Sequence, residues 1–258
     1  MPAPPVSVWL DSYRKDIKSA LLTAARDGFR CVQLNTSHEL FDPRELTTSA
    51  KRHLRRTLDD LGLRVDAVSP AFTGRGLADP ALADQRADRL RHTLTLCRDL
   101  GCPSTFVAID GLHDPEHAAL AREMLAYAAN WADGAGVQLA VDPRRREAID
   151  ALRDALDALR APHVGAMLDT IRHGADPQDL RQLAGRVGVL HVRDGRRAGD
   201  AVEETPLGEG ELDLAAVLAT VAQAGFAAAP AVRLDSPGAV DALRRGRETV
   251  ESLLRGGA

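Results

Sequence analysis

The chain has 258 residues, of which 45% are hydrophobic and only 3% aromatic, and its formal net charge at pH 7 is −4. Its length suits one large domain or two small ones, and the core must be built from aliphatic side chains. The weakly acidic charge argues against a protein that binds nucleic acid or an anionic membrane through electrostatic attraction.

Cysteine usage and hydropathy indicate the compartment. The three cysteines are too few and too irregularly spaced for a disulfide framework or a zinc finger, so we expect buried thiols in a reducing cytosol: Cys31, Cys97 and Cys102. No apolar run approaches the roughly 20 residues of a membrane span, and the first residues lack the features of a signal peptide. We therefore expect a cytoplasmic protein. A strong excess of arginine over lysine, with many alanines, indicates a GC-rich bacterial genome.

Short apolar runs typical of buried strands recur along the whole chain, and amphipathic helical patterns separate them. The predicted strands are 6–10, 31–34, 64–68, 105–109, 138–141, 164–168, 187–192 and 231–234. The predicted helices are 14–27, 44–61, 81–100, 115–135, 145–160, 176–184, 212–224 and 237–255. Eight such units without a linker predict an α/β fold, a single (β/α)8 TIM barrel spanning residues 1–258. A doubly wound open sheet is the alternative.

Polar side chains end four successive predicted strands, from the fifth to the eighth. Asp142, Asp169, His191 and Arg233 fall at positions that face the inside of a barrel near its carboxyl-terminal mouth. Barrels of this kind carry their chemistry at that end. Two carboxylates and an imidazole are a donor set that suits a divalent metal. Each residue alone is equally typical of a helix cap or of a hydrogen bond within the core.

At this point the chain resembles the sugar phosphate isomerase/epimerase superfamily, the xylose isomerase-like TIM barrels. The resemblance rests on GFRCVQLN after the first helix, LDT ending the sixth strand, HVRD ending the seventh, and TPLGEGELDLAAVLATVAQAGF after it. The family's metal ligands end the fifth, sixth, seventh and eighth strands as Glu, Asp, His and Glu. The resemblance places the Asp on Asp169 and the His on His191, both intact.

The other family positions differ in this chain. The fifth-strand Glu becomes Asp142, the eighth-strand Glu becomes Arg233, and the family's further His becomes Arg172, next to His173. Asp142 reaches about 1.5 Å less far than Glu, enough to misplace a catalytic base. Arg233 is a permanent cation and serves neither as a ligand nor as a base. Asp235 lies on the same face of the strand but about 6.6 Å further out, so it could supply the fourth ligand only if the strand register slips.

Two interpretations of function stay open. In the first, the protein is an isomerase or epimerase that moves a proton next to a carbonyl. Asp142 and Arg233 are then its catalytic residues, and Mn, Zn or Mg binds Asp142, Asp169 and His191. In the second, the barrel is catalytically inactive and binds a ligand or a partner, with Arg233 replacing the metal. An abasic-site endonuclease is disfavoured, because it would need three metals and histidines on the early strands.

Basic residues crowd the predicted mouth, which suggests a small polar, anionic, carbohydrate-like substrate held by guanidinium groups. The candidate substrate-binding residues are Trp9, Arg75, Arg172, His173 and Arg193. Solvated arginines are the alternative explanation. The segment Gly208-Glu209-Gly210 is predicted to be either a mobile loop over the site or a simple turn. A homo-oligomer is compatible with the sequence, but nothing in it demands one.

Overall fold

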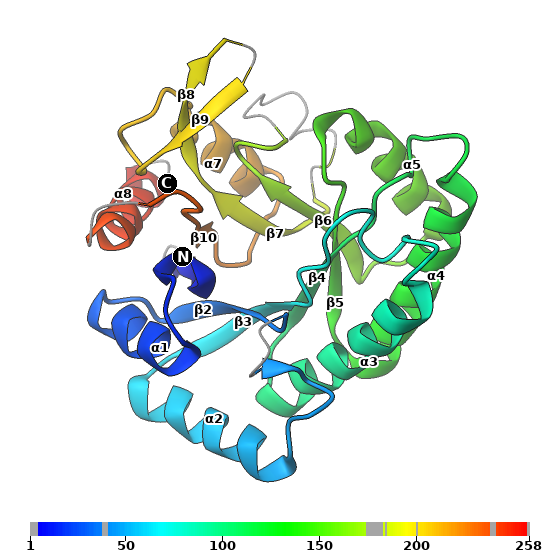
Figure 1. Cartoon of the computed structure of the whole chain (residues 1–258). Helices are drawn as coiled ribbons and strands as arrows, with labels where there is room; N and C mark the ends of the chain where they lie inside the picture. The colour runs from blue at the N-terminus through cyan, green and yellow to red at the C-terminus, as the bar shows by residue number, and fades with distance from the viewer. Residues whose placement is uncertain are drawn as a thin grey trace.

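Eight parallel strands close into a barrel in the order β1-β10-β7-β6-β5-β4-β3-β2 (Figure 1). The computed structural model describes residues 5–37, 41–173, 183, 185–199, 201–237 and 241–256. The barrel strands are β1 (Ser7–Trp9), β2 (Cys31–Asn35), β3 (Arg64–Ser69), β4 (Ser104–Ala108), β5 (Gln138–Asp142), β6 (Val164–Asp169), β7 (Val187–Val192) and β10 (Ala231–Val232). The predicted TIM barrel is confirmed, and the open sheet is excluded because β1 pairs with both β2 and β10.

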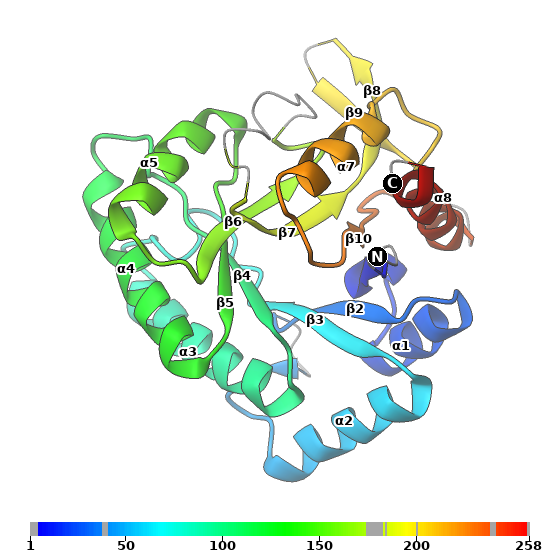
Figure 2. The ribbon, with the colours of Figure 1, turned by 180° about the vertical axis from the view of Figure 1, so that it is seen from behind.

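Helices cover the outside of the barrel (Figures 1 and 2). They are α1 (Ile17–Arg26), α2 (Thr48–Leu61), α3 (Ala83–Leu100), α4 (Ala118–Ala135), α5 (Ile149–Leu159), α7 (Leu214–Gln223) and α8 (Ala242–Gly256). Short 3-10 helices follow β1 (η1, Leu10–Tyr13) and precede α5 (η3, Arg146–Ala148). Side-chain caps begin several of the helices, as when Asp213 accepts a hydrogen bond from the amide of Ala216. The predicted helix 176–184 lies largely outside the described residues.

An antiparallel hairpin follows β7 and was missed by the sequence analysis. It consists of β8 (Asp194–Ala198) and β9 (Ala201–Thr205), and it projects from the barrel beside α7 and α8 in both views (Figures 1 and 2). Its residues are mostly polar or charged, so they give no apolar alternation from which a strand could be predicted. The hairpin brings Glu204 to the mouth of the barrel.

The core has two layers. The larger layer packs the strands against the surrounding helices and consists chiefly of Leu, Val and Ala. A smaller cluster fills the inside of the barrel, where one residue from each of six strands meets: Trp9, Ala67, Phe106, Ala140, Met167 and Val189. The aromatic members of this inner cluster, Trp9 and Phe106, pack directly against His191 at the mouth.

The three thiols are buried and free of disulfides, as expected. Among the described residues, no helix is both long and apolar enough to cross a membrane.

Candidate functional site

The strands deliver the four predicted site residues to one end of the barrel. Asp142 ends β5, Asp169 ends β6, and His191 lies in β7 directly opposite Asp169. Arg233 follows β10, where the register pairs Ala231 with His191. All four therefore lie at the carboxyl-terminal mouth, as the alternation along the strands predicted.

Two buried carboxylates at the mouth are neutralised by arginines. Arg172 lies between them, with its Nη1 atom 2.9 Å from Asp142 Oδ2 and its Nε atom 3.2 Å from Asp169 Oδ2. Arg193 adds a contact of 3.1 Å from its Nη1 to Asp169 Oδ2. The ion-pair network expected at this place exists, but Arg172 and Arg193 form it rather than Arg233.

These pairings set the ionisation of both carboxylates. Burial alone would raise the pKa of Asp142, but His173 and the charge of Arg172 outweigh it and hold that pKa well below its usual range. Burial acts the same way on Asp169, and the charges of Arg172 and Arg193 again lower its pKa. Both groups are therefore carboxylates at neutral pH and weak bases.

Arg233 pairs with a different partner from the one expected. Its Nε and Nη2 atoms each lie 2.8 Å from an oxygen of Asp235, and its Nη1 atom lies 3.3 Å from Nδ1 of His191. The guanidinium group also lies over the ring of Trp9, 5.7 Å from its centroid. Asp235 is only two residues away on the same side of the chain. It therefore forms the ion pair with the guanidinium group of Arg233 that was expected for the deeper carboxylates.

His191 is fully buried against aromatic rings. Its ring centroid lies 5.7 Å from that of Trp9 and 5.2 Å from that of Phe106. Burial and the nearby charge of Arg233 lower the pKa of His191 well below its ordinary value, so the ring is neutral. Its Nε2 atom lies 2.7 Å from Oε1 of Gln33, a contact that the sequence analysis missed. A polar residue in the otherwise buried strand CVQLN was the available signal.

The expected metal ligands do not form a metal site in this arrangement. No three His, Cys, Asp or Glu groups among the described residues stand close enough together to hold an ion. Both carboxylates face guanidinium groups, and Nδ1 of His191 faces Arg233. A divalent cation would have to displace fixed positive charges from each donor, so this donor set does not fit Mn, Zn or Mg.

The mouth contains a cavity of about 260 Å³, here called the mouth cavity. Three aromatic side chains, three arginines and three aspartates dominate its lining. The lining comprises Trp9, Asp11, Asn35, Ser69, Ala71, Phe72, Thr73, Phe106, Ala108, Asp142, Arg144, Arg172, Arg233 and Asp235. Of the five predicted substrate-binding residues, Trp9 and Arg172 belong to this lining. Both positive and negative side chains therefore face the same small space.

The other three predicted substrate-binding residues lie elsewhere. His173 is buried and accepts a hydrogen bond from the amide of Asp169 at its Nδ1 atom, 3.0 Å away. Arg193 is engaged by Glu204 and Asp235 in addition to Asp169. Arg75 is absent from the described lining of the mouth cavity. His173 and Arg193 contact the buried carboxylates Asp142 and Asp169, respectively, and do not belong to the described lining of the mouth cavity.

The segment Gly208-Glu209-Gly210 is a turn whose backbone amides are hydrogen-bonded to a side chain of β8. Asp194 of β8 accepts hydrogen bonds from the backbone amides of Gly208 and Gly210 at 2.9 and 3.1 Å. A Cβ atom on Gly210 would come within 2.0 Å of Asp194 Oδ1, so only glycine fits there. Of the two alternatives predicted for this segment, the structure shows the turn.

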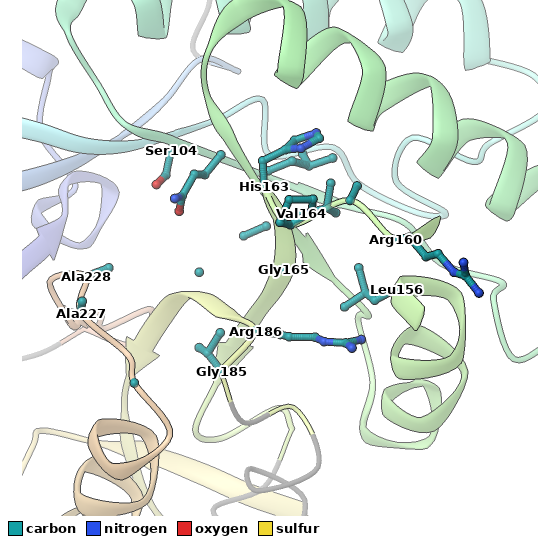
Figure 3. Close-up of a pocket in the computed structure, with 18 of the residues that line it drawn as sticks. Ser104, Leu156, Arg160, His163, Val164, Gly165, Gly185, Arg186, Ala227 and Ala228 are labelled. Carbon is teal, nitrogen blue, oxygen red and sulfur yellow. The ribbon is translucent and has the colours of Figure 1, made fainter. Parts of the chain in front are cut away.

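A larger cavity, about 600 Å³, opens at the opposite end of the barrel and is here called the floor cavity (Figure 3). Its lining includes the first residues of four consecutive strands: Ser104, Gln138, Val164 and Val187. Figure 3 shows Gly165, Ala227 and Ala228 around it as well. Catalytic sites of TIM barrels lie at the carboxyl-terminal face, so the smaller mouth cavity is the better candidate.

Comparison with known proteins agrees with this architecture. The family model described as "Xylose isomerase-like TIM barrel" matches residues 21–253. A xylose isomerase domain protein from Planctomyces limnophilus is 18% identical, with a TM-score of 0.80 over 99% of this chain and 97% of that one. The IOLI protein with a binding zinc atom is 16% identical, with a TM-score of 0.82 over 98% and 99%.

A D-tagatose 3-epimerase-like protein is also similar, with 14% identity and a TM-score of 0.78 over 98% of each chain. A search of curated proteins finds no match. At these identities the solved structures show a shared fold, while the activity of this chain has to be argued from its own residues.

Proposed function

The chain belongs to the xylose isomerase-like TIM barrel family, and we propose that it binds a small carbohydrate-like molecule, carrying a carboxylate or phosphate group, in the mouth cavity without a divalent metal. Arginines supply the positive charge that other members of the family take from the metal. The proposal concerns ligand binding first. Proton transfer is a second candidate, considered below.

The position of Arg172 carries this proposal. Its guanidinium group lies between Asp142 and Asp169, and its side chain still keeps 26% of its accessible surface. A cation thus occupies the space between the two carboxylates to which the resemblance assigns the metal. Because Arg172 uses only part of its hydrogen-bonding capacity on these carboxylates, it can also donate to a ligand oxygen.

The rest of the lining suits a sugar-like ligand. Arg233 keeps 20% of its side-chain surface accessible and is fixed by Asp235 and the ring of Trp9, so its guanidinium plane is oriented before a ligand arrives. Guanidinium groups recognise carboxylates and phosphates through paired hydrogen bonds. Phe72 and Phe106 add apolar walls that suit the C–H faces of a sugar ring.

Thermal unfolding in the presence of EDTA tests this proposal. We expect inorganic phosphate, a sugar phosphate and a sugar acid each to raise the Tm of the chelated protein, and an uncharged sugar to have a smaller effect. The variant Arg233→Ala should lose most of the shift. The matched control Arg244→Ala, an exposed arginine on α8, should keep it. Equal shifts in all three proteins would indicate general salt action and contradict the proposal.

Proton transfer next to a carbonyl is the second candidate, and the placement of two carboxylates favours it. Asp11 follows β1 and Asp142 ends β5, and these strands are diametrically opposed in the closed barrel. Epimerisation needs an acid and a base on opposite faces of the substrate, and a fixed guanidinium group can stabilise the developing oxyanion. Against it, the lowered pKa of Asp142 makes that carboxylate a weak base.

Solvent exchange separates the two candidates. A metal-free isomerase incubated with a ligand in D2O and EDTA should place deuterium on the carbon next to the carbonyl, and Asp11→Asn should abolish this. NMR of the recovered ligand measures the exchange. Tight binding with no deuterium incorporated would leave ligand binding as the function and exclude the epimerase candidate.

A further inference from the structure

A series of buried and partly buried side-chain hydrogen bonds, here called the relay, runs from the floor of the barrel to its mouth. Ser7 Oγ donates to Asp66 Oδ1 at 2.6 Å, and Gln33 Nε2 donates to Asp66 Oδ2 at 3.3 Å. Gln33 Oε1 then lies 2.7 Å from Nε2 of His191, which stands 158 positions away in the sequence. At the mouth end of this series of contacts, Nδ1 of His191 lies 3.3 Å from Nη1 of Arg233.

From these contacts we infer that Gln33, oriented by Asp66, is a positioning residue: it selects one tautomer of His191 and thereby fixes Arg233 in the mouth cavity. The link to ligand affinity rests on the function proposed above. The statement about the tautomer does not depend on it.

The chemistry of each partner dictates the direction of every bond. Burial raises the pKa of Asp66 to about 7, so above this pH the side chain is a carboxylate and only accepts. The amide nitrogen of Gln33 must then face Asp66, and its carbonyl oxygen must face His191. That oxygen also only accepts, so Nε2 of His191 carries the proton. The unprotonated Nδ1 atom then accepts from Arg233, which is permanently charged and only donates.

The buried surroundings of His191 favour the same assignment of its protons. The ring is buried at 0% exposure and packs against Trp9 and Phe106, which favours the neutral form with a single N–H. The neutral ring carries one N–H proton. Its position on Nδ1 or Nε2 decides whether His191 presents a donor or an acceptor to Arg233 in the mouth. Protonation at Nδ1 would set two donors against each other at Arg233.

Asp66 supplies the charge that keeps Gln33 in this orientation. It lines a second floor cavity, about 520 Å³, together with Cys31, Arg64 and Ser104. Without that charge, the amide of Gln33 can turn over and present its NH2 group to His191. The ring would then have to accept at Nε2 and carry its proton on Nδ1, and Arg233 would lose one of its three side-chain partners.

Long-range ¹H–¹⁵N NMR of the ¹⁵N-histidine-labelled protein at pH 8, where Asp66 is ionised, measures the tautomer directly. The variant His191→Asn is used to assign the signals. In the wild type we expect the Nδ1 signal of His191 in the range of an unprotonated ring nitrogen and the Nε2 signal in the protonated range. Asp66→Asn and Gln33→Met should each move Nδ1 toward the protonated range.

A matched control removes a buried hydrogen bond outside the relay. Thr105 Oγ1 in β4 donates to the carbonyl of Val68 in β3 at 2.8 Å, and Thr105→Val should leave the His191 signals unchanged. Titration with inorganic phosphate should show an affinity about tenfold lower in Asp66→Asn than in the control, as expected for the loss of one hydrogen bond to a charged group.

Each outcome decides something. A wild-type His191 protonated at Nδ1 overturns the inference without any variant, and so does an unchanged tautomer in Asp66→Asn. If Gln33→Met fails to fold, Asp66→Asn still tests the relay, because it keeps the size of the side chain. If phosphate binds none of the proteins while the tautomer shifts as expected, the proposed function fails and the positioning role of Gln33 stands.

Discussion

The two ends of the barrel treat a buried carboxylate in opposite ways. At the mouth, Asp169 is paired with Arg172 and Arg193, and its pKa is held below the usual range. Toward the floor, burial raises the pKa of Asp66 to about 7, and the hydrogen bonds from Ser7 and Gln33 lower it only in part. The same residue type in the same barrel therefore differs in charge near neutral pH.

This difference shows that burial alone does not decide ionisation. Desolvation penalises the charged form at both ends, and the presence of a fixed cation within reach determines which form is favoured. The charges of Asp142 and Asp169 at the mouth consequently do not change near neutral pH. The floor contains a carboxylate that titrates near neutrality and is linked to the mouth through neutral groups alone.

Removing Arg172, which lies between the two buried carboxylates, should destabilise the protein most. Arg172→Ala leaves Asp142 and Asp169 without their shared partner, and we expect it to lower the free energy of unfolding by about 3–5 kcal/mol. Urea denaturation measures the change, with Arg244→Ala as the exposed control, which should cost no more than about 1 kcal/mol. A loss as small as that of the control would mean that the carboxylates find another cation.

Converting two arginines back to the residues of the family should turn the mouth into a metal site. Arg172→His combined with Arg233→Glu removes two of the competing charges, leaves Arg193 beside Asp169, and adds two possible ligands. We expect added Zn²⁺ or Mn²⁺ to stabilise this double variant by roughly 2.7 kcal/mol when the free ion is at 100 times its Kd. Arg233→Glu alone should show no such effect, because Arg172 still neutralises both carboxylates. Metal-dependent stabilisation of the wild type would contradict our account of the donor set.

Asp66→Asn tests the floor through the pH dependence of stability. The raised pKa means that the folded protein binds more protons than the unfolded chain between about pH 4 and pH 7, so wild-type stability falls as the pH rises through this range. The variant does not titrate at this position. It should be more stable than the wild type by about 1–3 kcal/mol near pH 8, and the difference should vanish near pH 4. A constant difference across this range would show that Asp66 is ionised throughout.

The smallest effect on stability should come from Arg233→Ala. Arg233 and its partner Asp235 keep 20% and 42% of their side-chain surface accessible, and Arg193 stays beside Asp235 in the variant. We expect a loss below about 1 kcal/mol in urea denaturation, together with the loss of phosphate binding described above. A loss of stability comparable to that of Arg172→Ala would indicate that Arg233, rather than Arg172, is the main cation that stabilises the carboxylates of the mouth.

Much of the architecture could be predicted from local pattern. Seven of the eight barrel strands begin within one residue of their predicted starts at 6, 31, 64, 105, 138, 164 and 187, and the eighth begins at the predicted Ala231. Apolar runs bounded by helical periods carry this information in the chain itself. The hairpin of β8 and β9 was missed because its polar strands depend on each other rather than on a buried face.

The positions of the site residues could be predicted, and their partners could not. Alternation along a strand places Asp142, Asp169 and His191 at the mouth from the sequence alone. The sequence analysis assigned Arg233 to the carboxylates, whereas Arg172 and Arg193 neutralise them. A polar residue in the buried strand CVQLN marks Gln33 as unusual, but its contact with His191 across the barrel interior could not be predicted from the sequence.

The sequence by itself thus determined the strands, the helices, their order in a barrel and the end at which its polar residues gather, because each of these follows from periodicities of a few residues. Only the tertiary structure decided which guanidinium lies against which carboxylate and which nitrogen of His191 carries a proton. Those outcomes depend on the reach of long side chains and on angstrom-scale distances between residues as far apart as Gln33 and His191. They are settled when the barrel closes and brings such residues into contact.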